Sequence, residues 1–165
     1  MLSAGKEFCY MSVKYKVVIN DAQKTVKIPK GLRMLIRRSC IAALQNENVD
    51  TDTQVDVVFV DNQRISELNK KYYDDSSVVS SMVVSEDDGP LGCIFISVEK
   101  AVELSNLHLD SLEREVGYNV VHGVLALLGN KPENEVEESK LRDREEYIMY
   151  LLGLPASSAY ALNNA

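Results

Sequence analysis

Residues 117–132, which read GYNVVHGVLALLGNKP, predict one buried helix that ends at a glycine. Apolar residues fall on nearly all sides of this segment, which is typical of a helix in the centre of a domain rather than at its surface. Gly129 can adopt the left-handed backbone conformation that ends a helix. Upstream, Asp110 is suited to cap the helix, and Glu113 follows three residues later as in a capping box. We therefore expect a central helix over residues 110–128.

His122 is the one residue between Glu115 and Lys131 that can carry a charge near neutral pH. An isolated histidine among apolar residues indicates either a metal ligand or a neutral imidazole that is hydrogen-bonded in a core or cleft. A catalytic zinc needs three protein ligands, and Glu115 and Asn119 do not supply ligand spacing to a second strong donor. We therefore interpret His122 as a packed, neutral side chain.

Length and composition indicate one ordinary globular domain. The chain has 165 residues, of which 45% are hydrophobic and 26% charged, and it contains no apolar run of the roughly 18 residues that a membrane span requires. Its first ten residues, MLSAGKEFCY, lack the apolar core of a secretory signal. Three cysteines, Cys9, Cys40 and Cys93, are odd in number and scattered. They are typical of free thiols in a reducing intracellular compartment.

The distribution of charge favours one basic region in an acidic protein. Net charge is −7, which argues against extensive coating of nucleic acid and gives no reason to expect DNA as a partner. Residues 22–46 contain no Asp or Glu, so this span carries +6 and the remainder −13. The region is either a solvated helix surface or a face that contacts RNA phosphates. Its candidate RNA-binding residues are Lys24, Lys27, Lys30, Arg33, Arg37 and Arg38.

Hydrophobic periodicity predicts strands and helices along the rest of the chain. We expect strands over residues 13–20, 54–61, 81–84 and 91–97, with residues 24–28 continuing in extended form. Pro29 is expected to open a helix whose basic face lies opposite Leu32, Leu35 and Ile36. Further helices are predicted over residues 62–72, 98–106 and 133–152, the last with Leu141, Ile148, Leu151 and Leu152 inward. The set implies an α+β fold, in which helices cover a sheet of about four or five strands.

Several segments together resemble the YbeY family, a group of rRNA maturation factors often described as zinc-dependent endoribonucleases. The matching phrases are HGVLALLGNKP (122–132), FVDNQRISELNKKY (59–72), LGCIFIS (91–97) and LRDREEYIMYLLGL (141–154). The resemblance covers roughly residues 13–154, and it implies a YbeY-like domain with a mixed sheet. Residues 1–12 are then an N-terminal extension, and residues 155–165 a flexible C-terminal tail.

The resemblance also implies where a metal would bind, and there the chain departs from the family pattern. Members carry three metal-binding histidines in this motif, and those positions fall on His122, Ala126 and Pro132. An arginine thought to act on the scissile phosphate is replaced by Tyr73, and a strand aspartate by Cys93. One imidazole does not hold zinc. We therefore expect no bound zinc, no other cofactor and no catalytic residue, with His122 as the one residual candidate.

Three functions remain open. The first is a catalytically inactive YbeY-like assembly factor that binds ribosomal RNA and small-subunit ribosomal or assembly proteins. The second is a metal-dependent single-strand endoribonuclease whose rearranged site uses His122 and acids of the last helix. The third is an acidic adaptor without RNA contact. For the first, the resemblance implies an intracellular, reducing compartment, either the cytoplasm or an organelle such as the mitochondrion.

Overall fold

The computed structural model describes residues 13–156, in which strands and helices form one α+β domain. The predicted extension, Cys9 and most of the predicted tail lie outside the described residues. The predicted order of elements is confirmed. The elements are β1 (Tyr15–Asp21), α2 (Leu32–Asn46), β2 (Thr53–Val60), α3 (Asn62–Tyr73), β3 (Ser81–Ser85), β4 (Gly92–Ser97), α4 (Val98–His108), α5 (Leu112–Leu127) and α6 (Glu135–Leu151).

The four strands form one mixed sheet in the order β1-β2-β4-β3. β1, β2 and β4 run parallel, whereas β3 pairs antiparallel with β4. β1 and β3 are therefore the two edges, and each carries a row of backbone groups without a strand partner. The expected mixed sheet of about four or five strands is confirmed.

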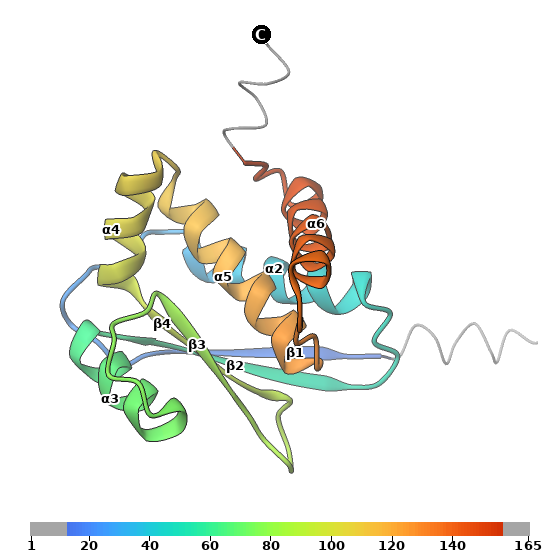
Figure 1. The fold of residues 1–165 in the computed structure, drawn as a ribbon, viewed down its shortest axis with the longest axis horizontal. Helices are drawn as coiled ribbons and strands as arrows, with labels where there is room; N and C mark the ends of the chain where they lie inside the picture. Colours follow the sequence, from blue (N-terminus) through green and yellow to red (C-terminus); the bar gives the residue numbers. More distant parts are fainter. Residues whose placement is uncertain (1–12, 157–165) are drawn as a thin grey trace, which may run out of the picture.

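The helices lie in unequal numbers on the two faces of the sheet. Figure 1 shows α2, α4, α5 and α6 on one face and α3 on the other. The larger core joins the first four helices to the sheet, with Phe59, Ile94 and Leu125 fully buried in it. A smaller core lies under α3, where Ile65 and Leu68 pack against Val60 and Met82.

Helix α5 is the central helix that the sequence predicts, although its cap differs. The side chain of Ser111 caps the helix by accepting a hydrogen bond from the amide of Arg114 at 3.1 Å. The expectation that Asp110 is the cap was wrong by one residue, because either side chain can serve and the chain turns into the helix only after Ser111. Gly129, with φ of 95°, ends the helix as expected.

Gly123 lets α5 approach the sheet closely. A Cβ atom at this position would lie 2.9 Å from Cδ1 of Ile94 on β4 and 3.1 Å from its Cγ1. Those distances are shorter than carbon atoms tolerate in a packed interior, so a larger residue would push the helix from the sheet. The glycine therefore sets the height of α5 above β4, and with it the position of His122.

The segment before α2 departs from the expectation of an extended chain and a helix opened by Pro29. Residues 24–26 form a bend, around which the buried Gln23 side chain accepts hydrogen bonds from the amides of Thr25 and Val26. Gly31, with φ of 87°, precedes the first helical residue, Leu32. Because Gly31 supplies a left-handed turn that proline cannot form, the helix begins there and not at Pro29.

Two arginines of α2 cover the free edge of β1. Nη1 of Arg37 donates to the carbonyl oxygen of Val17 at 2.9 Å, and Nη1 of Arg33 to that of Ile19 at 3.4 Å. Four helical residues span about 6 Å and two strand residues about 6.6 Å, so the spacings match. Beyond the two roles that the sequence left open for this basic face, a solvated surface or a phosphate contact, Arg33 and Arg37 also close a sheet edge.

The outer face of α6 is less polar than expected. Leu141, Ile148 and Leu152 point inward as predicted, but Leu151 is 55% exposed. Tyr147 and Tyr150, on the same outer side, are 54% and 66% exposed. The prediction for Leu151 was wrong because Leu151 lies one turn after Tyr147 on the outer side of α6, whereas Leu152 lies one turn after the buried Ile148.

Within residues 13–156, no helix combines the length and apolar character needed to cross a membrane.

Candidate functional site

His122 lies on the surface of α5 and pairs with a buried acid of α6. Its Nδ1 is 2.7 Å from Oε1 of Glu145, and the other carboxyl oxygen accepts a hydrogen bond from the hydroxyl of Tyr118. The side chain of His122 is 53% exposed, whereas that of Glu145 is 3% exposed. The carboxyl group is thus held between two donors, and the histidine lies at the outer end of a short network.

This pairing changes the expected protonation of His122. The hydrogen bond to Glu145 raises the pKa of His122, an effect that exceeds the opposing one of burial, and the negative charge of Glu145 adds to the increase. Burial, followed by the hydrogen bond to Glu145, raises the pKa of Tyr118. The expected hydrogen bond of His122 is present, but the side chain is 53% exposed and not packed in a core, and its partner is an acid that shifts it toward imidazolium.

Ala126 and Pro132 leave the region beside His122 without the donors that a metal needs. Ala126 follows one turn later on α5 and carries only a methyl group, and Pro132 lies in the loop to α6 and has neither a side-chain donor nor an N–H. Across residues 13–156, no group of three or more His, Cys, Asp or Glu side chains is placed to hold a metal ion. The donors present do not fit a zinc ion with three protein ligands.

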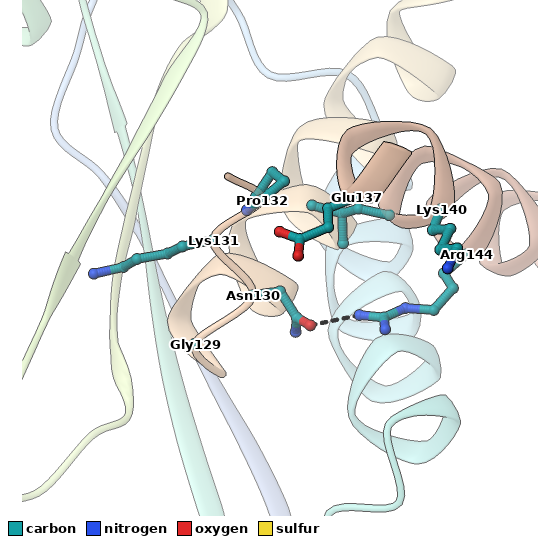
Figure 2. A pocket seen from close by; sticks show the side chains of 8 residues that line it. Gly129, Asn130, Lys131, Pro132, Glu137, Lys140 and Arg144 are labelled. Atoms are coloured by element: carbon teal, nitrogen blue, oxygen red, sulfur yellow. Dashed lines mark hydrogen bonds between the residues drawn. The ribbon is translucent and has the colours of Figure 1, made fainter. Parts of the chain in front are cut away.

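The loop after α5 is fastened to α6 by other side chains (Figure 2). Asn130 donates through Nδ2 to the carbonyl oxygen of Leu125 at 2.9 Å and accepts at Oδ1 from Arg144 at 2.6 Å. Arg144 also lies 3.0 Å from a carboxyl oxygen of Glu47. A pocket lies between this loop and α6, and in Figure 2 Lys131 extends away from the other residues that line it. Asn130 thus links the end of α5 to α6.

A groove follows the free edge of β3. One wall is the C-terminal end of α3, where Tyr73 donates its hydroxyl hydrogen to the carbonyl oxygen of Val83, and the other is α5 with His122, Gly123 and Ala126. The cavity between these walls has a volume of about 200 Å³. The exposed rings of Tyr73 and His122 therefore border one cavity although they come from helices on opposite faces of the sheet.

The predicted basic residues lie on a separate part of the molecule. All six side chains are exposed, and no carboxylate of the described residues forms an ion pair with any of them: Lys24, Lys27, Lys30, Arg33, Arg37 and Arg38. The structure brings Arg33 and Arg37 together at the edge of β1. Their role in RNA binding stays a prediction.

Sequence reasoning did not single out Glu145 or Tyr118. Tyr118 stands one turn before His122, a spacing that places both rings on one side of α5, and the rings are nearly parallel with centroids 6.4 Å apart. Glu145 is 23 residues beyond His122 and belongs to a helix with many acids. The spacing could have identified Tyr118, whereas only the three-dimensional packing identifies which acid is buried.

The remaining cysteines are inert thiols within the folded domain. Cys40 and Cys93 are both free and buried, and burial raises the pKa of each to about 12. Since the thiolate is the form that binds metals and attacks substrates, neither residue is suited to such a role. For Cys40 and Cys93, the prediction of free thiols is confirmed.

Comparisons with known proteins agree on one family. A family model described as Endoribonuclease YbeY matches residues 18–153. An Endoribonuclease YbeY of Caldanaerobacter subterraneus subsp. tengcongensis is 38% identical over 154 residues, which cover 83% of this chain and 98% of that protein. An Endoribonuclease YbeY of Alkaliphilus metalliredigens is 36% identical over 148 residues, which cover 84% of this chain and 96% of that protein. The solution structure of a Thermotoga maritima protein, 21% identical, matches with a TM-score of 0.53 over 81% of this chain and 89% of that one, and so supports the fold. The chain therefore belongs to the YbeY family.

Proposed function

We propose that this chain acts in ribosome assembly or rRNA maturation by binding rather than by zinc-dependent cleavage. Its relatives are named Endoribonuclease YbeY, which supports RNA as the class of partner. The partners proposed are ribosomal RNA and the ribosomal or assembly proteins of the small subunit. The compartment proposed is an intracellular, reducing one, either the cytoplasm or the mitochondrion.

The observation that carries this proposal is the replacement of two of the three family metal positions. Ala126 and Pro132 offer no donor, and Nδ1 of His122 is engaged by Glu145. A catalytic zinc held by protein needs about three ligands and an open position. We therefore infer that the chain holds no catalytic zinc, and we assign no chemical step to one.

The basic region supports RNA binding on electrostatic grounds. Arg33 and Arg37 donate to neutral carbonyl groups, and no carboxylate within residues 13–156 forms an ion pair with either. By contrast, Arg114 pairs with Glu146 at 2.7 Å and Arg144 with Glu47 at 3.0 Å. An uncompensated, partly immobilised cation is well suited to a phosphate group, because it gives up no acid partner on binding.

The test combines metal content with RNA binding. We expect elemental analysis of the dialysed protein to find well below one zinc per chain, and we expect no cleavage of single-stranded RNA. A Lys24/Lys27/Lys30→Ala variant, which spares the arginines at the edge of β1, should bind small-subunit rRNA more weakly. Its log–log salt dependence should be shallower by roughly 0.7 for each phosphate that the variant no longer neutralises.

The matched control is Lys100/Lys131/Lys140→Ala, which removes the same charge from other parts of the surface. It should bind rRNA nearly as well as the wild type. One zinc per chain together with RNA cleavage would overturn the proposal, as would a wild-type protein without affinity for rRNA. Equal losses of affinity in the two triple variants would show that the basic region is not the RNA-binding surface of the proposal.

A second candidate function has one specific observation in its favour. Glu145 comes from the last helix and holds Nδ1 of His122, which leaves Nε2 outside this hydrogen bond on a side chain that is 53% exposed. This is the arrangement in which a carboxylate orients an imidazole for proton transfer. It would support RNA cleavage through a rearranged site. His122→Ala and Glu145→Gln should then each abolish a cleavage activity of the purified wild type.

A further inference from the structure

The free edge of β3 carries backbone groups that point away from the sheet. β3 is the last strand in the sheet order and pairs only with β4. The amide of Ser97 donates to the carbonyl oxygen of Ser80 at 2.9 Å, so the residues of β3 at even positions bond to β4. In an antiparallel pair the residues between them direct both backbone groups to the other side. These outward residues are Ser81, Val83 and Ser85.

The hydrogen bond from Tyr73 agrees with this direction. Its hydroxyl donates to the carbonyl oxygen of Val83, which therefore faces away from β4. The amide of Val83 and the outward groups of Ser81 and Ser85 have no strand partner. Such a row of alternating donors and acceptors is matched by the backbone of an extended peptide, which adds to the sheet as a further strand.

The cavity beside this edge suits one aliphatic side chain. Its volume of about 200 Å³ is below the roughly 300–1,000 Å³ of pockets that enclose a drug-sized ligand. Among the described residues that line it, none is Asp, Glu, Lys or Arg. Its apolar lining residues are Val79, Met82, Val83, Gly123 and Ala126. Every second side chain of an added strand points to the same side, so one of them can enter the cavity.

An acidic turn follows the edge directly. Glu86, Asp87 and Asp88 come after Ser85, and all three are exposed. None of them forms an ion pair within residues 13–156. Their negative charge attracts lysine and arginine and repels phosphate groups, so it favours a basic peptide over a nucleic acid at this edge.

We propose that the free edge of β3 binds an extended segment of a partner protein as an added strand, with an aliphatic side chain in the cavity and basic residues toward the acidic turn. The inference rests on the proposed protein partners and adds the surface and the form of the segment that is bound. Backbone hydrogen bonds would supply affinity, and the cavity and the turn would supply specificity.

The first experiment measures binding of a labelled, acetylated peptide with the sequence KKTVTLTKK by fluorescence anisotropy. Each of its five central residues is N-methylated in turn, which removes one backbone donor at a time. Only every second residue of an added strand directs its N–H toward β3. We therefore expect losses of affinity of roughly 3- to 10-fold at alternate residues and almost none at the residues between them.

The second experiment changes the protein. Val83→Pro removes an outward amide at a position where an edge strand tolerates proline, and it should weaken peptide binding by roughly 3- to 10-fold. Val83→Thr is the matched control, because it keeps the amide and the branched shape, and it should bind within about twofold of the wild type. Melting temperatures of both variants establish that the fold is intact. The N-methylated peptides decide the question even where Val83→Pro does not fold.

The acidic turn is tested separately by a variant that carries Glu86→Gln, Asp87→Asn and Asp88→Asn. It should bind the peptide more weakly and with a shallower salt dependence, since three charges that attract lysine are removed. Equal binding and an equal salt dependence would overturn the assignment of the basic residues to this turn.

Four results would overturn the binding of a peptide strand. They are equal losses at consecutive N-methylated residues, no binding of the peptide by the wild type, displacement of the peptide by a short single-stranded RNA, and a wild-type dimer that Val83→Pro dissociates. The third would assign the edge to nucleic acid and the fourth to a second copy of the chain. Affinity for rRNA, measured on the same wild-type sample, reports on the proposed function independently of all four.

Discussion

Glu145 is expected to be the most sensitive polar residue of the domain. Its carboxyl group is buried at 2% residue exposure and is shared by His122 and Tyr118. Glu145→Ala removes the acceptor of both and leaves a cavity between α5 and α6. Truncation of a large buried side chain leaves a cavity and costs about 2–5 kcal/mol. For a chain of 165 residues, each kcal/mol shifts the melting temperature by about 2–4 °C, so we expect a decrease of roughly 4–20 °C.

Removal of the histidine should cost much less than removal of the acid. In His122→Ala, Glu145 retains the hydroxyl of Tyr118, and water can reach the half-exposed position of the imidazole. We expect a loss of about 1 kcal/mol, because solvent screens the interaction of an exposed group. That corresponds to a decrease of about 2–4 °C. Glu145→Gln, which preserves the shape and one acceptor, should lie between the two alanine variants.

The assay is thermal unfolding followed by circular dichroism, with Tyr147→Leu as the control for a change on the exposed side of α6. This control should alter the free energy of unfolding by no more than about 0.5 kcal/mol. If Glu145→Ala and His122→Ala lowered the melting temperature equally, the carboxyl group would not be the centre of the network. A Glu145→Ala variant as stable as the wild type would refute the reasoning altogether.

Three further predictions test the pH dependence of His122, the contact between α5 and β4, and the edge of β1. The pKa of His122 is raised in the folded state, so its pairing stabilises the fold fully below the unfolded pKa of about 6.5 and less as pH rises through the folded pKa. The difference in unfolding free energy between the wild type and His122→Ala should therefore be larger at acidic than at alkaline pH. A difference that does not change with pH would contradict this prediction. Gly123→Ala places a Cβ 2.9 Å from Ile94 and should lower the unfolding free energy in urea by about 1–3 kcal/mol; stability equal to the wild type would show that α5 can shift without cost. Arg37→Ala loses a 2.9 Å hydrogen bond to β1 and should cost about 0.5–1.5 kcal/mol, whereas Arg38→Ala, which makes no such bond among the described residues, should cost almost nothing.

Residues 117–132 indicated the architecture well because their information is local. A run that is apolar on all sides has to be buried, and Gly129 ends the helix through its own backbone conformation. The burial of Ile65 and Leu68 on α3, three residues apart, has the same periodicity. These features depend on neighbours three or four residues away, which the sequence displays directly.

The details that failed depend on contacts between distant elements. The surroundings of His122 are set by Glu145, 23 residues away on another helix, so no spacing along α5 reveals that the imidazole is hydrogen-bonded to a buried acid. The role of Arg33 and Arg37 at the sheet edge depends on β1 being an edge strand, which is a property of strand order. The exposure of Leu151 likewise depends on which side of α6 meets the rest of the domain.

The network around Glu145 gives His122 a place in the fold that needs no metal. Ala126 is partly exposed and Pro132 is exposed, so substitutions at these two positions disturb little of the core. His122 differs from them because a buried carboxyl group depends on it as a hydrogen-bond partner. Loss of a metal would therefore free two of the three positions from constraint but not the third. A single histidine at one of the three family metal positions is therefore consistent with packing, and its presence is no argument for bound zinc.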